Sequence, residues 1–297
     1  MPALIDLRKR IKSVRNTQQI TQAMKTVSMV KFQKAQRKVL ESRPQWHDSP
    51  ELVGEASLWA PRSSHPLLAQ REEKKVVGVV FTSDKGLAGA FNANLLERAF
   101  SFFTEKAETS DVRLILIGKK AVLFFKKTEF PVLKTYFGQV DKFTAEDCSK
   151  LAQFLMELYM LNKTDAVYVA YNEFKSILAP RVVITKLLPV EFSGDVEKSE
   201  GMEKKAMPAG QRPDWDPGAL LLIHSLLPYH VENQIIHFFF ESSAAEHAAR
   251  MMAMDNATKN ADDLIDDLTL VLNKMRQAAI TKELLEITSA VEALAKK

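Results

Sequence analysis

Gly118 and Lys119 form the one pair of residues in this chain that could begin a phosphate-binding loop. Such a loop needs a glycine five residues before that glycine and a Ser or Thr after the lysine, because backbone N–H groups and a hydroxyl complete the cradle. The chain has Arg113 and Lys120 at these two positions. We therefore predict no phosphate loop at this point.

A second glycine-containing segment, SDKGLAGAFN, runs from Ser83 to Asn92 directly after an apolar run. A dinucleotide-binding protein would carry Gly-x-Gly-x-x-Gly at this place, and that pattern is not present. Gly86 and Gly89 instead favour a tight turn over a ligand cradle.

Metal-binding and thiol chemistry are not predicted either. The single cysteine, Cys148, cannot form an intramolecular disulfide or a thiolate cluster, and it fits a reducing compartment. No two histidines have the helical spacing of metal ligands; the histidines are His47, His65, His224, His230, His237 and His247. The sequence thus predicts no catalytic, cofactor or metal site.

Nucleic-acid and membrane binding are also disfavoured. The first 43 residues are strongly basic, but Phe32 is their only aromatic residue, so they offer no stacking platform. No apolar run reaches the roughly 18 residues that a membrane span needs. The basic start imitates a mitochondrial transit peptide, but its apolar pattern continues past residue 30, so we interpret it as part of the folded chain.

The dominant element is a very long C-terminal helix. From Ala219 to Leu294 the chain has no glycine and one proline, Pro228. Apolar residues recur at spacings of three and four, the pattern of a coiled coil; they are Met254, Ala257, Ala261, Leu264, Leu268, Val271, Met275 and Ala278. At about 1.5 Å per residue such a helix is roughly 110 Å long, which indicates a protein that acts through partners rather than through a pocket.

Residues 3–42 predict a first helix that ends at Pro44. Its apolar stripe keeps the same spacing at first and then drifts; the members are Leu4, Leu7, Ile11 and Val14, followed by Ile20, Met24 and Val27. Antiparallel pairing of the two terminal helices would bury both stripes, and it would place Ile20–Val27 beside the last third of the long helix. Opposite charge could help to choose this pairing, since basic residues of the first helix would meet Asp255, Asp262, Asp263, Asp266 and Asp267. The alternative is two solvated helix faces.

Between these helices the sequence predicts an α/β domain. Strand signals lie at Val76–Phe81, Val112–Ile117, Val132–Phe137, Ala166–Tyr171 and Val182–Leu188. Helix signals lie at Asn92–Glu108, Lys119–Lys127 and Thr144–Leu161, the last opening with a capping box of Thr144 and Asp147. This alternation indicates a mostly parallel, Rossmann-like sheet covered by helices. The expected segments are a coiled-coil helix at 1–43, a connection at 44–75, the α/β domain at 76–192, a loop at 193–218 and the second coiled-coil helix at 219–297.

Three stretches of the chain resemble the γ subunit of F-type ATP synthases. They are Ile20–Val27 (ITQAMKTV) with the following Lys31 and Ala35-Gln36, the turn Thr82–Asn92, and the block Ser242–Ile287. The last block matches the C-terminal signature of that family almost throughout and is far more specific than a short motif. The resemblance is less clear over 44–65 and 193–215.

The resemblance implies a fold and a function. In that family the terminal helices form an antiparallel coiled coil, which is the rotating central shaft. The shaft stands in a ring of α and β subunits that hold the nucleotides, and the α/β domain binds the ε subunit and the membrane-embedded c-ring. The implied role is to couple ion flow to ATP synthesis or hydrolysis, without a catalytic site or cofactor of its own, without nucleic acid, and with membrane contact only through the complex.

The resemblance also implies the contact residues. Arg276 and Gln277 match the positions that touch a loop of the β subunit, with Thr281 and Glu283 one turn further on. Met24 and Lys25 are expected to face the same region from the first helix. The matching turn positions, near the C-terminal lobes of the β subunits, are Asp84, Lys85 and Gly86.

The chain departs from the family pattern at a few places. Lys85 and Ala88 stand where Arg and Cys are common, and a lysine lacks the bidentate fork of arginine. Lys296 and Lys297 follow the usual apolar end, and we expect them to protrude or snorkel. The segment that gives plastid relatives thiol regulation is absent.

The implied location is the cytoplasmic face of a bacterial inner membrane, where the protein would be peripheral; a mature organelle protein would look the same. Two other interpretations of the sequence are a coiled-coil adaptor with an α/β module and a nucleotide-binding enzyme with a helical arm. Co-purification separates the three, because a rotor returns with α, β and ε partners, an adaptor with other proteins, and an enzyme alone.

Overall fold

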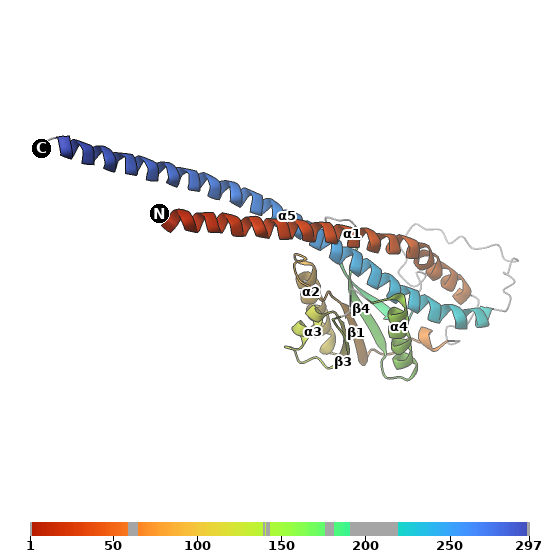
Figure 1. Ribbon diagram of the computed structural model, residues 1–297. Coiled ribbons are helices and arrows are strands. Elements are labelled where there is room, and N and C mark those ends of the chain that lie inside the picture. Colours follow the sequence, from red (N-terminus) through yellow and green to blue (C-terminus); the bar gives the residue numbers. More distant parts are fainter. Residues whose placement is uncertain are drawn as a thin grey trace, which may run out of the picture. The chain divides into compact units, whose positions relative to one another are not determined.

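The computed structural model describes residues 2–58, 65–138, 140, 143–175, 181–190 and 219–295. The chain divides into two compact units. One combines Met1–Met29 with Arg250–Lys297, and the other is Val30–Ala249. The two long helices, α1 (Pro2–Leu58) and α5 (Ala219–Ala295), contribute to both units (Figure 1).

The long C-terminal helix begins where the sequence predicts it, at Ala219, and contains Pro228. The predicted end of the first helix at Pro44 is wrong, because α1 continues to Leu58. A proline inside a helix removes one backbone hydrogen bond and bends the helix, but it does not have to end it. The predicted loop at 193–218, and Lys296 and Lys297, lie outside the described residues.

A five-stranded sheet forms the centre of the second unit. Its strands lie in the order β3-β2-β1-β4-β5, and their bounds are Lys75–Phe81 for β1, Asp111–Ile117 for β2, Val132–Tyr136 for β3, Ala166–Glu173 for β4 and Arg181–Leu188 for β5. The pairs β1–β2, β1–β4 and β2–β3 are parallel, and β4–β5 is antiparallel. The predicted mostly parallel sheet is confirmed.

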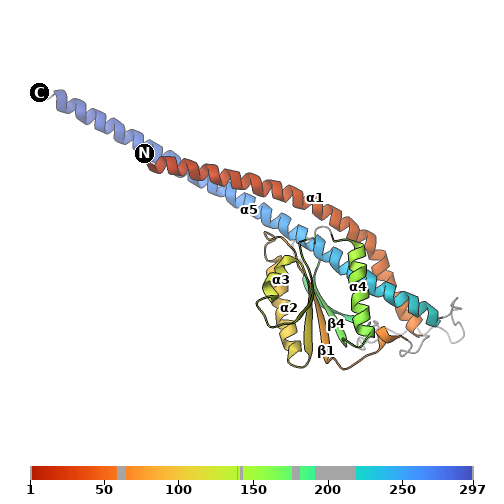
Figure 2. The ribbon, with the colours of Figure 1, turned by 60° about the horizontal axis from the view of Figure 1, so that its bottom comes forward.

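Helices cover both faces of this sheet (Figure 2). Helices α2 (Phe91–Ala107) and α3 (Lys119–Phe125) pack over one face, where β1 contributes Val76 and Val80. Helix α4 (Ala145–Met160), the short 3-10 helix η2 (Pro66–Leu68) and the first part of α5 pack over the other, where β1 contributes Val77 and Val79. Alternate side chains of a strand point to opposite faces, so one apolar strand supplies both cores.

The predicted capping box at the start of α4 is confirmed. The Thr144 side chain accepts a hydrogen bond from the Asp147 N–H, and the Asp147 carboxylate accepts one from the Thr144 N–H at 2.9 Å. Two N–H groups that a helix start would leave unpaired are thereby satisfied.

In the first unit, α1 and α5 pair antiparallel, as predicted. Lys25 binds Asp255 at 2.6 Å, Thr21 contacts Thr258 at 2.8 Å, and Gln18 donates to Asp262 at 2.5 Å. As the position on α1 moves towards the N-terminus, its partner on α5 moves towards the C-terminus. Ile20–Val27 therefore lies beside the middle of α5, and the prediction that it lies beside the last third is wrong.

The predicted drift of the α1 stripe is wrong at Ile20 and Val27, which are 60% and 57% exposed, and right at Met24, which is half-buried. The side chains turned towards α5 keep the three-four spacing without a break, and they are Leu4, Leu7, Ile11, Val14, Gln18, Thr21, Lys25 and Ser28. The stripe continues as polar residues, so a search for apolar side chains leaves the true face and follows exposed ones.

On α5 the predicted seam is right at some positions and wrong at others. Met254 and Ala261 are buried and Ala257 and Leu268 are half-buried, whereas the other four predicted members are exposed; these are Leu264, Val271, Met275 and Ala278. The remaining seam positions belong to Thr258, Ile265 and Leu272. The observed seam thus departs from the predicted one by one residue at alternate positions.

Candidate functional site

The turn between β1 and α2 is held in place by the carboxylate of Asp84. Its Oδ1 accepts hydrogen bonds from the backbone N–H of Lys119 at 2.9 Å and of Gly138 at 3.0 Å, and its Oδ2 accepts one from Val140 at 2.9 Å. A carboxylate bound by several N–H groups is an internal anchor. The predicted contact residue Asp84 is therefore engaged within the chain.

This contact joins the two glycine-containing segments, at Ser83–Asn92 and Gly118-Lys119, which lack the complete phosphate-binding motifs. Lys119 is the first residue of α3, where free N–H groups and the helix dipole favour an anion. The Asp84 carboxylate occupies that place. Gly118 is needed here for a different reason, since its φ is 95° and an added Cβ would lie 2.2 Å from the Thr82 carbonyl oxygen.

A second set of hydrogen bonds closes the turn. The Ser83 N–H donates to Asn92 Oδ1 at 3.1 Å, and the Ser83 hydroxyl donates to the Lys85 carbonyl oxygen at 2.7 Å. Leu87, with φ of 61°, projects outward and is 63% exposed, whereas Ala88 is 1% exposed. Lys85 is exposed and Gly86 is half-buried. The surface that this turn offers to a partner thus includes Lys85, Leu87, Gly89 and Ala90, and Leu87 was not among the predicted contact residues.

Below the turn, Ala88 belongs to a small apolar core that ties several elements together. It contains Phe32, Ala35 and Val39 of α1 and Ala244, Ala245 and Ala248 of α5, together with Phe91 and Phe174. The rings of Phe32 and Phe174 meet edge to face at 5.2 Å. This core anchors the turn to α1 and α5 within the second unit.

In the first unit, Lys25 lies in a polar layer of the coiled coil. Its ammonium binds Asp255 at 2.6 Å, and Lys259 binds the same carboxylate at 2.9 Å. Hydrogen bonds from Lys25 and Lys259 lower the pKa of Asp255 to about 2. The predicted charge complementarity is confirmed in the Lys25–Asp255 pair.

The expectation that Met24 and Lys25 face the region of Arg276 and Gln277 is wrong. Lys25 binds Asp255, and Arg276 stands 21 positions further along α5. At about 1.5 Å per residue this separates them by roughly 30 Å. Met24 is half-buried in the coiled coil, so the two sets of residues form separate surfaces.

The distal part of α5 carries the other predicted contact residues. Arg276, Gln277, Thr281 and Glu283 are all exposed, and the Thr281 hydroxyl donates to the Gln277 carbonyl oxygen at 3.0 Å. Exposed apolar side chains also recur there at spacings of four and three; they are Ile280, Leu284, Ile287 and Val291. An exposed apolar stripe of this kind marks an interaction surface. The same spacing rule that gave the coiled-coil seam could have found it.

The described residues contain no group of three or more His, Cys, Asp or Glu side chains placed to hold a metal ion. None of the helices in the described ranges is long and apolar enough to cross a membrane.

Known proteins resemble this chain over nearly its whole length. The family model described as ATP synthase matches residues 3–294. The chain is 42% identical over 294 residues to the ATP synthase gamma chain of Pelotomaculum thermopropionicum, covering 99% of this chain and 100% of that protein. It is 41% identical over 297 residues to the ATP synthase gamma chain of Solibacter usitatus, covering 99% of each.

Solved structures share the fold. A chain in the OSCP/F1/c-ring assembly of Euglena gracilis mitochondrial ATP synthase, in rotational state 3, aligns with a TM-score of 0.65 at 19% identity, covering 99% of this chain and 95% of that chain. A chain in the central stalk and c-ring structure of Tetrahymena thermophila mitochondrial ATP synthase aligns with a TM-score of 0.58 at 18% identity, covering 80% of this chain and 99% of that chain.

Proposed function

Because the chain belongs to the gamma-chain family of the ATP synthases, we propose that it is the central rotating shaft of such a complex. In this role it couples ion flow through a membrane ring to ATP synthesis or hydrolysis in a ring of α and β subunits. The observation that carries the proposal is the 42% identity over essentially the full length of both chains. The antiparallel pair of α1 and α5 supports it, since a shaft needs two helices that turn as one body.

The mechanism is a shift of populations. A shaft with different side chains on its different sides contacts identical β subunits differently, and so favours a different nucleotide state in each. Turning the shaft permutes these preferences. Coupling between two processes is reciprocal, so the same contacts serve synthesis and hydrolysis.

The chain itself is non-catalytic in this proposal, and the nucleotide sites lie on the β subunits. Its other partners are the ε subunit and the c-ring. It is peripheral to the membrane and reaches it only through the complex, on the cytoplasmic face if the source is bacterial. The proposed division of the chain by role keeps the α/β domain at 76–192, the loop at 193–218 and the second coiled-coil helix at 219–297, whereas the first helix extends to Leu58.

The proposed contact residues fall into two groups. Arg276, Gln277, Thr281 and Glu283 lie exposed on distal α5, beside the apolar stripe that a surrounding sleeve of partner residues would cover. In the turn, Lys85 and Gly86 stay proposed contacts with the β subunits, and Asp84 acts through the position of the turn. Met24 and Lys25 act within the shaft, where Lys25 helps to fix the pairing of its helices.

Replacing Arg276 and Gln277 together with Leu tests the first group. The expected result is weakened ATP synthesis and weakened cooperative hydrolysis in assembled complexes with normal folding of the isolated chain, because these exposed side chains would contribute polar contacts across the interface. The matched control carries Leu at Asn260 and Asp263, which are also exposed on α5. Normal rates in complexes with both changes at 276 and 277 would refute the assignment of these two residues.

A further inference from the structure

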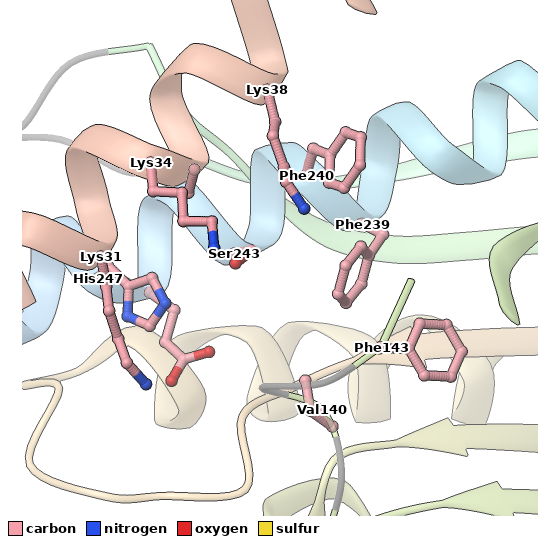
Figure 3. A pocket seen from close by; sticks show the side chains of 11 residues that line it. Lys31, Lys34, Lys38, Val140, Phe143, Phe239, Phe240, Ser243 and His247 are labelled. Atoms are coloured by element: carbon pink, nitrogen blue, oxygen red, sulfur yellow. The ribbon is translucent and has the colours of Figure 1, made fainter. Parts of the chain in front are cut away.

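A pocket of about 190 Å³ lies in the second unit between α1 and α5. Figure 3 shows Lys31, Lys34 and Lys38 reaching into it from α1, with Phe239, Phe240, Ser243 and His247 on α5 and with Phe143 and Val140 on the opposite side. The three lysines stand at spacings of three and four, so they share one face of the helix. The pocket therefore combines a cationic rim with a largely aromatic floor.

The charges around the pocket do not balance. Three lysines and one carboxylate, that of Glu246, line it. Lys31, Glu246 and His247 also interact with other groups. The positive charge available to a ligand is therefore that of Lys34 and Lys38. Over the described ranges, Lys34 has no hydrogen-bond or ion-pair partner. The Lys38 ammonium lies over the Phe240 ring, 5.2 Å from its centre.

The Lys34 and Lys38 side chains are both exposed at the rim of the pocket, and an anion between them would be attracted by both. Phe143, Phe239 and Phe240 bring apolar surface beside the lysines, which reduces the screening of an anion by water. Ser243 adds a hydroxyl that can donate a hydrogen bond to an oxyanion. Lysine is a common ligand of phosphate, acting as a point charge.

The size of the pocket limits the ligand. At about 30 Å³ per water molecule, its volume corresponds to roughly six waters. Sites for drug-sized ligands are larger, at about 300–1,000 Å³. A pocket of this volume holds a single phosphate group with a few waters, whereas a nucleotide would extend beyond it.

We propose that this pocket binds inorganic phosphate, held by Lys34 and Lys38 with the Ser243 hydroxyl as a further donor. This inference is independent of the rotor function, because it rests on the lining of one pocket within one unit. Mg-ATP should not bind there.

The test is a titration of the purified full-length chain with inorganic phosphate, followed by calorimetry and by ³¹P line broadening. We expect saturable binding to one site. Replacing Lys34 and Lys38 with Gln should weaken it at least about tenfold, equivalent to roughly 1.4 kcal/mol. The control carries Gln at Lys126 and Lys127, which removes the same charge elsewhere in the same unit, and it should bind like the wild type.

Two more arms make the result specific. Ser243→Leu fills the pocket without changing its charge and should also weaken phosphate binding. This result would distinguish binding in the pocket from general attraction of phosphate to a basic surface. Flotation with vesicles of anionic phospholipid tests whether a lipid headgroup is the true source of the phosphate group. Absence of saturable phosphate binding, equal binding by the Lys34/Lys38 variant, or binding to vesicles alone would overturn the proposal. Circular dichroism of each variant checks that it is folded.

Discussion

The hydroxyl oxygens of Thr21 and Thr258 lie 2.8 Å apart, buried in the interface between α1 and α5. Each hydroxyl also lies within hydrogen-bond distance of a carbonyl oxygen of its own helix, at Gln18 for Thr21 and at Met254 for Thr258. With Gln18–Asp262 and Lys25–Asp255 on either side, the pair forms a polar layer in the coiled coil. Polar groups in such a seam select one register, because any other register leaves them buried without partners.

This arrangement predicts a marked difference between single and double substitutions. Thr258→Val alone removes one partner of a buried contact and should lower the free energy of unfolding by about 1 kcal/mol. Thr21→Val with Thr258→Val replaces both hydroxyls by groups of the same shape and should be close to neutral. Urea unfolding followed by circular dichroism measures Thr21→Val, Thr258→Val and the double variant. If the effects of the two single changes simply add, the contact has no energetic role.

The anchor at Asp84 gives a second prediction. Asp84→Asn leaves one acceptor oxygen and adds an NH₂ group that faces backbone N–H donors, so it should cost about 1–3 kcal/mol of stability. Lys85→Gln, next in sequence and exposed, should change stability by less than about 0.5 kcal/mol. Thermal unfolding of the isolated chain compares the two variants. Equal effects would mean that Asp84 is a surface contact rather than an anchor.

His230 gives a prediction about pH. Burial disfavours the charged imidazolium and lowers the pKa of His230 from 6.5 to about 4. The unfolded chain therefore binds the proton more tightly than the folded chain. The free energy of unfolding is highest above pH 6.5 and decreases as the pH falls towards 4. The loss amounts to roughly 3 kcal/mol. His230→Leu should flatten unfolding free energy against pH in this window, and an unchanged slope would contradict the assignment.

The strands and the helices of the α/β domain could be predicted because each depends on local periodicity, and the antiparallel pairing followed from the need to bury the apolar stripes of both terminal helices. The strand of Val76–Phe81 and the capping box of Thr144 are signals carried by neighbouring residues. The coiled-coil register could not be predicted in the same way. Its middle is polar, and Gln18 and Thr21 resemble a break in an apolar stripe until α5 is placed beside them.

The internal role of Asp84 in the turn between β1 and α2 could not be predicted from local sequence either. Asp84 receives its hydrogen bonds from Lys119, Gly138 and Val140, all distant in sequence. The family resemblance identified the segment correctly but assigned contact to Asp84, whose carboxylate is used internally, and did not indicate that Ala88 is buried. A residue's match to a family position does not reveal which way its side chain points.

The exposure of Leu87 decides how the rotor proposal is best tested. A cysteine at Ala88 would be buried, whereas a cysteine at Leu87 can reach a partner. The native Cys148 is buried in the core, where desolvation raises the pKa of its thiol, so it should stay unreactive. An engineered cysteine should therefore give a single cross-linking site.

The most direct measurement compares two disulfides in the assembled complex. One joins Thr21→Cys to Thr258→Cys within the shaft, and the other joins Leu87→Cys to a cysteine on a β subunit. If the chain is a rotating shaft, ATP turnover should persist with the first bond closed, since both helices move together, and it should stop with the second bond closed and return on reduction. Full turnover with the shaft-to-β bond quantitatively closed would contradict rotation as the function of this chain.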